Sequence, residues 1–410
     1  MLVRSVEHEA GVDVQEESGC GTIIARRLRP MTTTLSAAFE LQTLLDKMVA
    51  AGAPGVSAAM ATRRGVVWTG VAGMANLLTG ERMRYDSLLG IGSITKTFIA
   101  VVILQLVEEG HLCLDSTAES ILGWEVIEGI ANAETATIAQ LLNHTSGIRS
   151  WENDPKWIME GRGALLDVSK LWGRRDPLAY IKGSPPLAGP GEKYSYSNTN
   201  YTLLGLIVEK ATRDEAVNAI RERILTPLAL SDIYLEAFEA VPQNRLARRY
   251  HWATDDFREA AGISPAFPQV RSNLIDASSS NLSPEWAAGG MVATARDLSL
   301  YGVALRDGVL LAESSMRFMM MWKAAGTAAG VNIQIGHNLF REQFANGLVL
   351  IGHTGNVLGY TAALYWIENF DAVVSILCNV GSMHSGTVPI SITSSAKSTE
   401  FMQAVLKLHD

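Results

Sequence analysis

The chain has 410 residues, of which 48% are hydrophobic and 19% are charged, and its formal net charge is −8. A globular chain of this length exceeds the usual size of a single core, so we expect one two-lobed unit or two domains. The acidic balance and the lack of a Lys/Arg cluster argue against nucleic acid as a partner, and the apolar runs are too short to span a membrane.

Residues 1–30 differ in character from the rest of the chain. Acidic side chains recur through residues 7–17, which leaves no apolar segment of the kind a secretory signal peptide requires. We therefore predict that residues 1–30 form a disordered or loosely packed appendage, with Met31 as an alternative start and the cytoplasm as the location.

Helical spacing of apolar residues predicts an amphipathic helix over residues 35–51. Two strand-like runs come next, at 56–61 and 66–71, and the Arg-Arg-Gly turn between them indicates a β-hairpin. The next segment, residues 90–100 (GIGSITKTFIA), joins a loop to an apolar helix that starts near Ser93.

Ser93 and Lys96 are three residues apart, and positions i and i+3 lie on one face of a helix. The hydroxyl and the amine can therefore meet, while the N–H groups of the first turn face whatever Ser93 attacks. These are the parts of an activated serine nucleophile. A simpler interpretation makes Ser93 a helix cap, and Ser394 and Lys397 repeat the same spacing near the C-terminus.

Residues 111–285 are mainly helical by pattern. His144 lies in a predicted helix-ending turn, so we expect no chemical role for it. Trp151, Trp157 and Trp172 either line a substrate pocket or, as we favour, pack beneath a long loop. Residues 251–285, rich in proline and polar residues, are predicted to be irregular and to border the active site.

The last third of the chain is predicted to contain helices at 296–305 and 313–322, then strands at 331–338, 348–352, 357–366 and 372–378, and a helix at 399–408. The early hairpin and these late strands would form one sheet. The domain prediction is thus an α/β lobe of residues 31–110 and 286–410, with residues 111–285 inserted as a helical lobe and the active site at the seam.

Two further motifs come after Ser93 in order: Tyr196-Ser197-Asn198 and His353-Thr354-Gly355. With S-x-x-K they make the chain resemble the penicillin-recognising serine hydrolases. The Y-x-N and H-T-G forms resemble the branch of class C β-lactamases, D-alanyl-D-alanine carboxypeptidases, D-amino-acid amidases and β-lactamase-like esterases. Residues 141–147 (LLNHTSG) and 288–294 (AGGMVAT) are similar to further pieces of that branch.

The resemblance implies a β-lactamase/transpeptidase-like fold of the α/β (α+β) class, with an antiparallel sheet flanked by helices. Ser93 would form the acyl-enzyme, Lys96 and Tyr196 would act as one coupled base, and Asn198 would orient Lys96 and a substrate carbonyl. By resemblance, the backbone N–H groups of Ser93 and Asn356 would form the oxyanion hole.

The triplet His353, Thr354 and Gly355 would bind substrate, with Gly355 leaving room for it to approach. Histidine replaces the lysine of the β-lactamase form and, with an ordinary pKa of about 6.5, is mostly neutral at pH 7, which weakens the case for β-lactam hydrolysis. A rival triplet, residues 384–386 (HSG), lacks a subsequent strand pattern.

These observations predict a serine hydrolase that acts on small amides or esters, with D-amino-acid amides, D-peptides and simple carboxylic esters preferred. Acyl transfer and β-lactam hydrolysis at the same site are alternatives, and a catalytically silent ligand-binding protein of the same fold is the alternative from another class. No metal or nucleotide motif is present, so we expect no cofactor, no metal and a small-molecule partner; the oligomeric state is not indicated.

Overall fold

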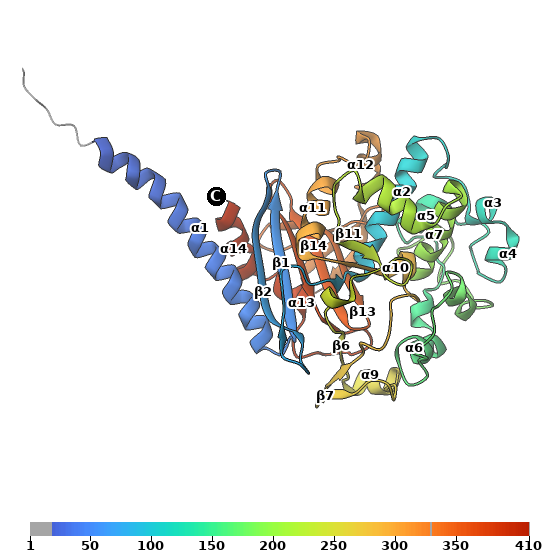
Figure 1. Ribbon diagram of the computed structural model, residues 1–410. Coiled ribbons are helices and arrows are strands. Elements are labelled where there is room, and N and C mark those ends of the chain that lie inside the picture. The colour runs from blue at the N-terminus through green and yellow to red at the C-terminus, as the bar shows by residue number, and fades with distance from the viewer. Residues whose placement is uncertain (1–18, 329, 410) are drawn as a thin grey trace, which may run out of the picture.

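The computed structural model describes residues 19–328 and 330–409, with the backbone alone for residues 19–34 and 409. Within these residues, a nine-stranded antiparallel sheet forms the centre of one side of the molecule, and a helical region lies beside it (Figure 1). This is the β-lactamase/transpeptidase-like α/β fold that the sequence predicts.

The sheet joins strands from both ends of the chain, because β1 pairs with β15 as well as with β2. Its order is β10 (Lys323–Ala328), β11 (Val331–Ile335), β12 (Phe340–Gln343), β13 (Val349–Val357), β14 (Tyr360–Ile367), β15 (Val373–Cys378), β1 (Gly55–Thr62), β2 (Gly65–Asn76) and β3 (Glu81–Arg82).

Two smaller sheets complete the strands of the described chain. One has the order β16 (Val380–Gly381), β6 (Tyr250–Trp252), β8 (Leu274–Asp276) and β7 (Gln269–Arg271), and the other has the order β4 (Leu89–Gly90), β9 (Met291–Ala293) and β5 (Ile233–Leu235). The second sheet holds the chain that leads into Ser93.

The helices differ widely in length. The α-helices are α1 (Gly19–Ala50), α2 (Thr95–Glu108), α3 (Ala118–Leu122), α4 (Trp124–Ile127), α5 (Ile138–Leu142), α6 (Pro155–Arg162), α7 (Asn198–Thr212), α8 (Ala216–Ile220), α9 (Asp255–Ala260), α10 (Trp286–Gly289), α11 (Ala295–Arg306), α12 (Glu313–Met319), α13 (Ile392–Ala396) and α14 (Thr399–His409). Short 3₁₀ turns are η1 (Gly92–Ile94), η2 (Trp151–Asn153), η3 (Asp176–Tyr180) and η5 (Gln243–Arg245), and η4 (Arg221–Leu225) is a π-helix.

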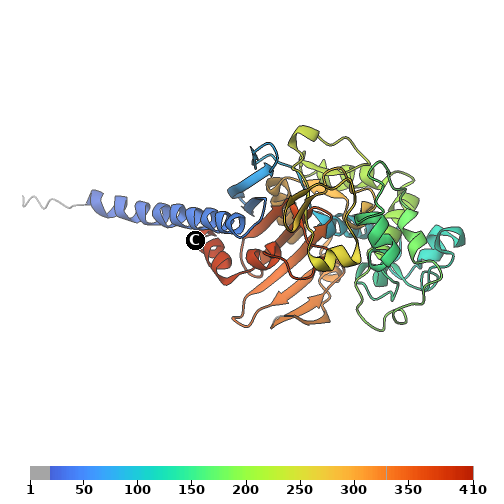
Figure 2. The same ribbon diagram turned by 90° about the horizontal axis from the view of Figure 1, so that it is seen from below.

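Helices cover both faces of the large sheet, so its central strands are buried on both sides (Figure 2). On one face, α1 packs against β1, β2 and α14, and α13 packs against β14. On the other face, α11 packs against β1, β2, β14 and β15. Helix α2 is rich in apolar residues, and most of its residues are buried, as expected for a helix inside the core.

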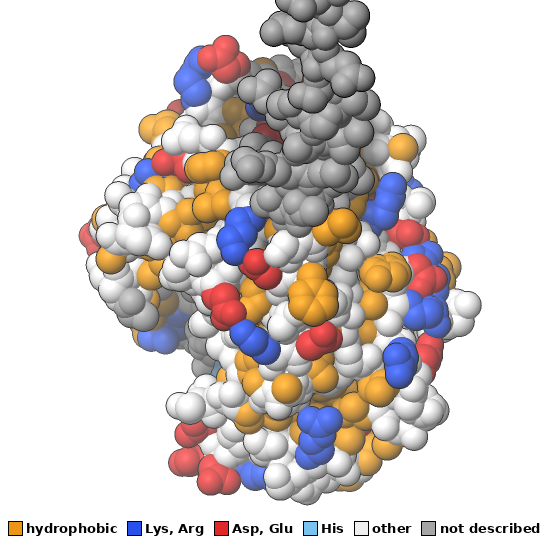
Figure 3. Space-filling view, turned by 90° about the vertical axis from the view of Figure 1, so that its left-hand side faces the viewer, with side chains coloured by type: hydrophobic (Ala, Val, Ile, Leu, Met, Phe, Trp, Pro, Cys, Tyr) orange, Lys and Arg blue, Asp and Glu red, His pale blue; other side chains and the backbone are white. Residues whose placement is uncertain are grey.

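Helix α1 begins at Gly19, well before the start at residue 35 that apolar spacing predicts. Its later part is tied to α14 by the ion pairs Lys47–Glu400 and Lys407–Glu40. Figure 3 shows hydrophobic side chains scattered among charged ones on the side of the molecule where this helix lies, and Phe39 is 74% exposed. Of the appendage predicted at residues 1–30, residues 1–18 lie outside the described residues, and residues 19–30 are the first part of α1. The loose packing of this segment remains a prediction.

Two details of the sequence prediction need correction. Residues 251–285 are not irregular throughout, because they contain α9, β7 and β8 and continue β6 into a small sheet. Strands β10 and β12 are also present where the sequence pattern predicts no strand. Among the described residues, no helix is long and apolar enough to cross a membrane.

The three tryptophans at 151, 157 and 172 are buried, which favours packing over pocket lining. Trp151 and Trp157 pack against each other with ring centroids 4.6 Å apart, and the Trp151 indole N–H donates a hydrogen bond to Thr202. Trp172 contacts Tyr180 instead. These rings therefore belong to the core of the helical region.

Candidate active site

Ser93 lies in the 3₁₀ turn η1 that opens helix α2. The chain before it is fixed by β4, which pairs with β9, and by a hydrogen bond from the Ile91 N–H to the Met291 carbonyl. From the other direction, the Met291 N–H donates to the Thr95 hydroxyl. These bonds fix the position of the half-exposed Ser93 side chain.

Lys96 meets Ser93 as the three-residue spacing predicts. Its Nζ lies 2.8 Å from Ser93 Oγ and 2.5 Å from the Ala288 carbonyl oxygen, and the side chain is fully buried. Burial lowers the pKa of Lys96 to about 7, although the Glu152 and Glu285 carboxylates act in the opposite direction. A large fraction of Lys96 is therefore neutral near pH 7, with a lone pair beside the Ser93 hydroxyl.

Tyr196, in the segment before α7, is the third member of the group that contains Ser93 and Lys96. Lys96 Nζ lies 5.0 Å from the centre of its ring. Burial raises the pKa of Tyr196 well above its ordinary value, although the neighbouring Ser93 hydroxyl favours the ionised form. The Tyr196 hydroxyl makes no hydrogen bond of good geometry to any described residue, although it is buried. It is thus a protonated phenol that faces the reacting group with a donor to spare.

Asn198 begins helix α7, and its backbone N–H donates to Ser150. Its side chain interacts with Glu152, whose pKa is raised by burial although this contact favours the ionised carboxylate. The Asn198 Oδ1 is buried without a partner among the described residues. Glu152 in turn acts on Lys96, so Asn198 and Lys96 are linked through this carboxyl group.

The H-T-G triplet lies within β13, which continues past residue 352, where the sequence pattern ends the predicted strand. Strand β12 pairs with β13 only as far as Gly352, so one edge of β13 beyond that residue is left open by β12. This open edge packs against η1: a Cβ built on Gly92 would lie 2.7 Å from Asn356 N, and a Cβ on Gly355 would lie 1.9 Å from the Ile91 carbonyl oxygen. Gly355 is therefore required for contact between backbones, and not only for the approach of substrate.

The same close packing places the Asn356 N–H beside the turn that carries Ser93, as an oxyanion hole formed by these two residues would need. The Asn356 side chain points elsewhere and exchanges hydrogen bonds with Ser382 through both its amide nitrogen and its amide oxygen. Thr354 is half-buried on the same strand.

His353 lies between the site and a small cavity. Its Nδ1 lies 2.5 Å from the Thr354 carbonyl, so Nδ1 carries the proton and the buried, unpartnered Nε2 presents a lone pair. Burial, together with the charge of Lys96, lowers the pKa of His353 to about 3. The ring is therefore neutral, as the sequence predicts, and its centroid lies 6.3 Å from that of Tyr196.

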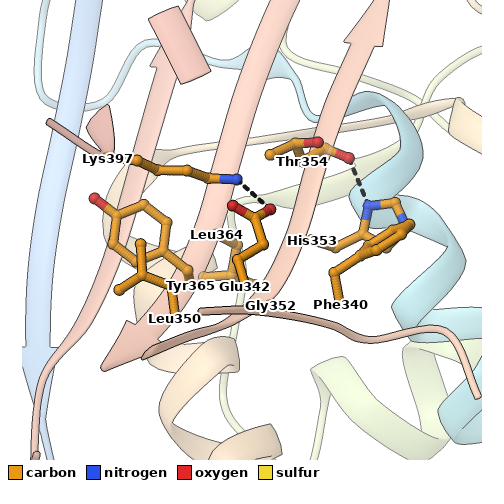
Figure 4. A pocket seen from close by; sticks show the side chains of 9 residues that line it. All are labelled: Phe340, Glu342, Leu350, Gly352, His353, Thr354, Leu364, Tyr365 and Lys397. Atoms are coloured by element: carbon orange, nitrogen blue, oxygen red, sulfur yellow. Dashed lines mark hydrogen bonds and ion pairs between the residues drawn. The ribbon is translucent and has the colours of Figure 1, made fainter. Parts of the chain in front are cut away.

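The small pocket beside His353 is lined by residues that include Phe340, Glu342 and Lys397. Figure 4 shows His353 and Phe340 together at one side of it, and the ion pair of Lys397 with Glu342 at the other. Lys397 belongs to the second S-x-x-K sequence, and its partner is Glu342 rather than the exposed Ser394. That sequence is therefore not a second nucleophile.

The rival H-S-G triplet lies outside the strands of the described chain, whereas His353, Thr354 and Gly355 lie in β13. Ser385 is fully buried, and its hydroxyl donates a 2.6 Å hydrogen bond to the Trp252 carbonyl. The neighbouring His251 accepts from the Gly359 N–H at Nδ1, so its Nε2 carries the proton and donates to the Met383 carbonyl. The Ser385 hydroxyl proton and both ring nitrogens of His251 are thus already engaged.

Sequence reasoning did not place His144 beside Tyr196. Its imidazole is fully buried and stacks on the Tyr196 ring, with centroids 4.2 Å apart and planes 29° apart. The signal in the sequence was only the local turn pattern, which does not show what the turn contacts.

Sequence reasoning also missed a buried ion cluster below Lys96. Arg162, at the end of α6, lies 2.8 Å from Glu285 and 3.6 Å from Glu152, and all three side chains are almost inaccessible. Their charges act on Lys96. Single charged residues so far apart in the chain give no sequence signal. The described residues hold no group of three or more His, Cys, Asp or Glu side chains arranged to bind a metal ion.

Comparison with known proteins agrees with this arrangement. The beta-lactamase family model matches residues 41–388. Penicillin-binding protein 4 of Amycolatopsis lactamdurans is 33% identical over 39% of this chain, and esterase EstB of Burkholderia gladioli is 29% identical over 52% of it. These matches span 39% and 55% of the two relatives.

Solved structures match over nearly the whole chain. D-amino acid amidase from Ochrobactrum anthropi SV3 is 26% identical with a TM-score of 0.79, covering 90% of this chain and 99% of that one. A D-stereospecific amidohydrolase from Streptomyces sp. is 27% identical with a TM-score of 0.75, covering 89% and 99%. The chain therefore belongs to the beta-lactamase family of serine hydrolases.

Proposed function

We propose that this protein hydrolyses small amides or esters through an acyl-enzyme on Ser93. The observation that carries the proposal is the 2.8 Å contact between Ser93 Oγ and a buried lysine whose pKa is lowered to about 7. A serine hydroxyl is a weak nucleophile unless a neighbouring base accepts its proton, and this lysine is in position to do so.

Of the coupled pair, Lys96 is the better candidate for the first base. The pKa of Tyr196 is raised, so its phenol holds a proton where Lys96 is largely neutral. As Ser93 Oγ bonds to the substrate carbonyl carbon, its proton moves to Lys96, and the Ser93 and Asn356 N–H groups stabilise the oxyanion.

Collapse of this intermediate breaks the bond to the leaving group, which needs a proton. The unpartnered Tyr196 hydroxyl can supply it and then recover a proton from Lys96. Water enters in the second half, loses a proton to the same pair, and releases the acid from Ser93. Asn198 Oδ1 and His353 Nε2 are free acceptors for substrate N–H groups in this site.

Among substrates, we favour D-amino-acid amides, D-peptides and simple carboxylic esters. A neutral His353 offers no permanent cation for the carboxylate that β-lactams carry. The similarity to a D-amino acid amidase and to an esterase supports the same choice. Acyl transfer uses the same first step and differs only in the nucleophile that replaces water.

The test is Ser93→Ala, compared with Ser394→Ala, the serine of the second S-x-x-K sequence. Intact mass spectrometry after a fluorophosphonate probe should show one label on the wild type and on Ser394→Ala, and none on Ser93→Ala. The loss should extend to turnover of p-nitrophenyl esters and of D-amino-acid p-nitroanilides. Labelling that persists without Ser93 would reject the proposal, and a wild type that never labels would favour the silent binding protein.

A further inference from the structure

We propose that His144 is the residue that positions Tyr196 for proton transfer, a role that rests on the proposed function of Tyr196. The turn that His144 occupies holds the Tyr196 segment at several points. The His144 carbonyl accepts from the Ser195 N–H at 2.8 Å, the Thr145 carbonyl accepts from the Gly191 N–H at 2.7 Å, and His144 Nδ1 accepts from the Ser197 N–H at 3.1 Å. Bonds therefore fall on both sides of Tyr196.

The hydrogen bonds fix the tautomer of His144. Nδ1 accepts from the backbone of Ser197 and lies 3.4 Å from the side-chain amide of Asn200, so it carries the lone pair. The proton is then on Nε2, which is buried without a partner among the described residues. A ring with this tautomer cannot rotate without losing the Ser197 bond, and its face consequently stays against Tyr196.

The surroundings keep the ring uncharged. Burial lowers the pKa of His144 well below its ordinary value, and the nearby Lys96 and His353 act in the same direction. Two further rings lie beside the imidazole: the Tyr201 centroid is 5.3 Å from the His144 centroid, and the Tyr194 centroid is 6.3 Å from it. A neutral ring can stack on Tyr196 without competing for its proton, and a charged one would oppose protonation of Lys96.

The backbone of His144 also departs from common geometry, with φ at +57°. Outside glycine this region is uncommon, and asparagine is among the residues that tolerate it best. The position therefore allows a variant that separates the two contacts of the side chain. His144→Asn retains a side-chain acceptor for the Ser197 N–H and the αL backbone, but it removes the ring that covers Tyr196.

The test measures kcat for a p-nitrophenyl ester per active site, counting sites by fluorophosphonate labelling so that misfolded protein does not contribute. For His144→Asn we expect kcat per labelled site to fall about tenfold or more with little change in KM, because a small displacement of a proton donor slows its transfer. His144→Phe, which keeps a ring but cannot accept from Ser197, should also lose kcat.

The control is His337→Asn. His337 is a buried histidine that stacks on Phe318 and contacts the same turn through Asn143, but not Tyr196. The His337→Asn substitution should lower the melting temperature of the protein and leave kcat per labelled site close to that of the wild type. If His144→Asn also kept its kcat per labelled site, the positioning role would be wrong and His144 would be only structural. Failure of the wild type to label would instead reject the proposed function itself.

Discussion

At the scale of single residues, the site contains a polar group whose burial is unfavourable for folding. Lys96 is fully buried, and the unfolded chain would hold its proton up to a pKa of about 10.4, whereas the folded protein releases it near pH 7. Between about pH 7 and pH 10.4 the unfolded state binds more protons than the folded state, so the free energy of unfolding rises with pH. Below this range the buried, charged amine lowers the free energy of unfolding. Such costs are typical of catalytic positions.

Replacing this amine by a methionine of similar length should therefore stabilise the protein while it removes activity. For Lys96→Met we expect fluorophosphonate labelling to disappear, and the free energy of unfolding at pH 7 to rise by about 1–3 kcal/mol. The gain should shrink as pH is raised toward 10, because the unfolded chain then also loses the proton. Denaturant unfolding at pH 7 and pH 9.5 measures it.

Lys397→Met is the matched comparison, with the opposite sign. Lys397 has the same position in the second S-x-x-K sequence but pairs with Glu342 at the cavity of Figure 4. Its loss leaves a partly buried carboxylate unpaired and should destabilise by about 1 kcal/mol. A Lys96→Met protein that unfolds more easily at pH 7 would contradict the assignment of a lowered lysine pKa.

At the scale of elements, the site depends on how closely β13 approaches η1. The sequence predicted the helix that η1 opens, the first part of β13 and the motifs beside them, because helix and strand periods are local properties of the chain. It did not predict β12, whose residues do not alternate in a clear apolar pattern, and so it could not show where β13 becomes an open edge. It also could not show that His144 stacks on Tyr196, since their proximity comes from tertiary packing alone.

The close approach gives a prediction for Gly355→Ala. The added methyl group would lie 1.9 Å from the Ile91 carbonyl oxygen, so η1 and β13 must move apart. We expect a loss of stability of about 1–3 kcal/mol and, because Asn356 N–H shifts relative to Ser93, a fall in kcat of about a hundredfold. Thermal unfolding and ester turnover per labelled site measure the two effects.

Gly289→Ala is the control, since a methyl group there meets its nearest neighbours at ordinary contact distances of 3.4 Å. Its melting temperature should remain close to that of the wild type. An equally stable and active Gly355→Ala protein would mean that the two elements do not need this contact.

At the scale of the whole molecule, charges from distant parts of the chain meet below the site. Glu152 and Arg162 come from η2 and α6, and Glu285 precedes α10, whose Ala288 carbonyl holds Lys96. Burial has the largest effect on the pKa of Lys96 and lowers it, and Arg162 acts in the same direction. The two carboxylates oppose both effects. The cluster therefore links the packing of the helical region to the pH at which the site works.

Glu285→Gln should reveal this link in the pH dependence of kcat/KM. If neutral Lys96 is the base, the wild-type rate rises with pH through about 7. Removing the Glu285 charge removes an influence that raises the pKa of Lys96, so the rise should move to lower pH. Glu152→Gln should shift it in the same direction, and Arg162→Gln in the opposite one if enough folded protein remains to be titrated with the probe.

Glu313→Gln provides the control, because Glu313 pairs with Arg317 at the exposed surface, with 86% of its own side chain accessible. It should leave the pH profile unchanged and stability within about 0.5 kcal/mol of the wild type. The neighbouring His353 cannot account for a transition near pH 7, because its pKa is lowered to about 3. A transition that stays in place in all three cluster variants would therefore remove Lys96 as the group that titrates.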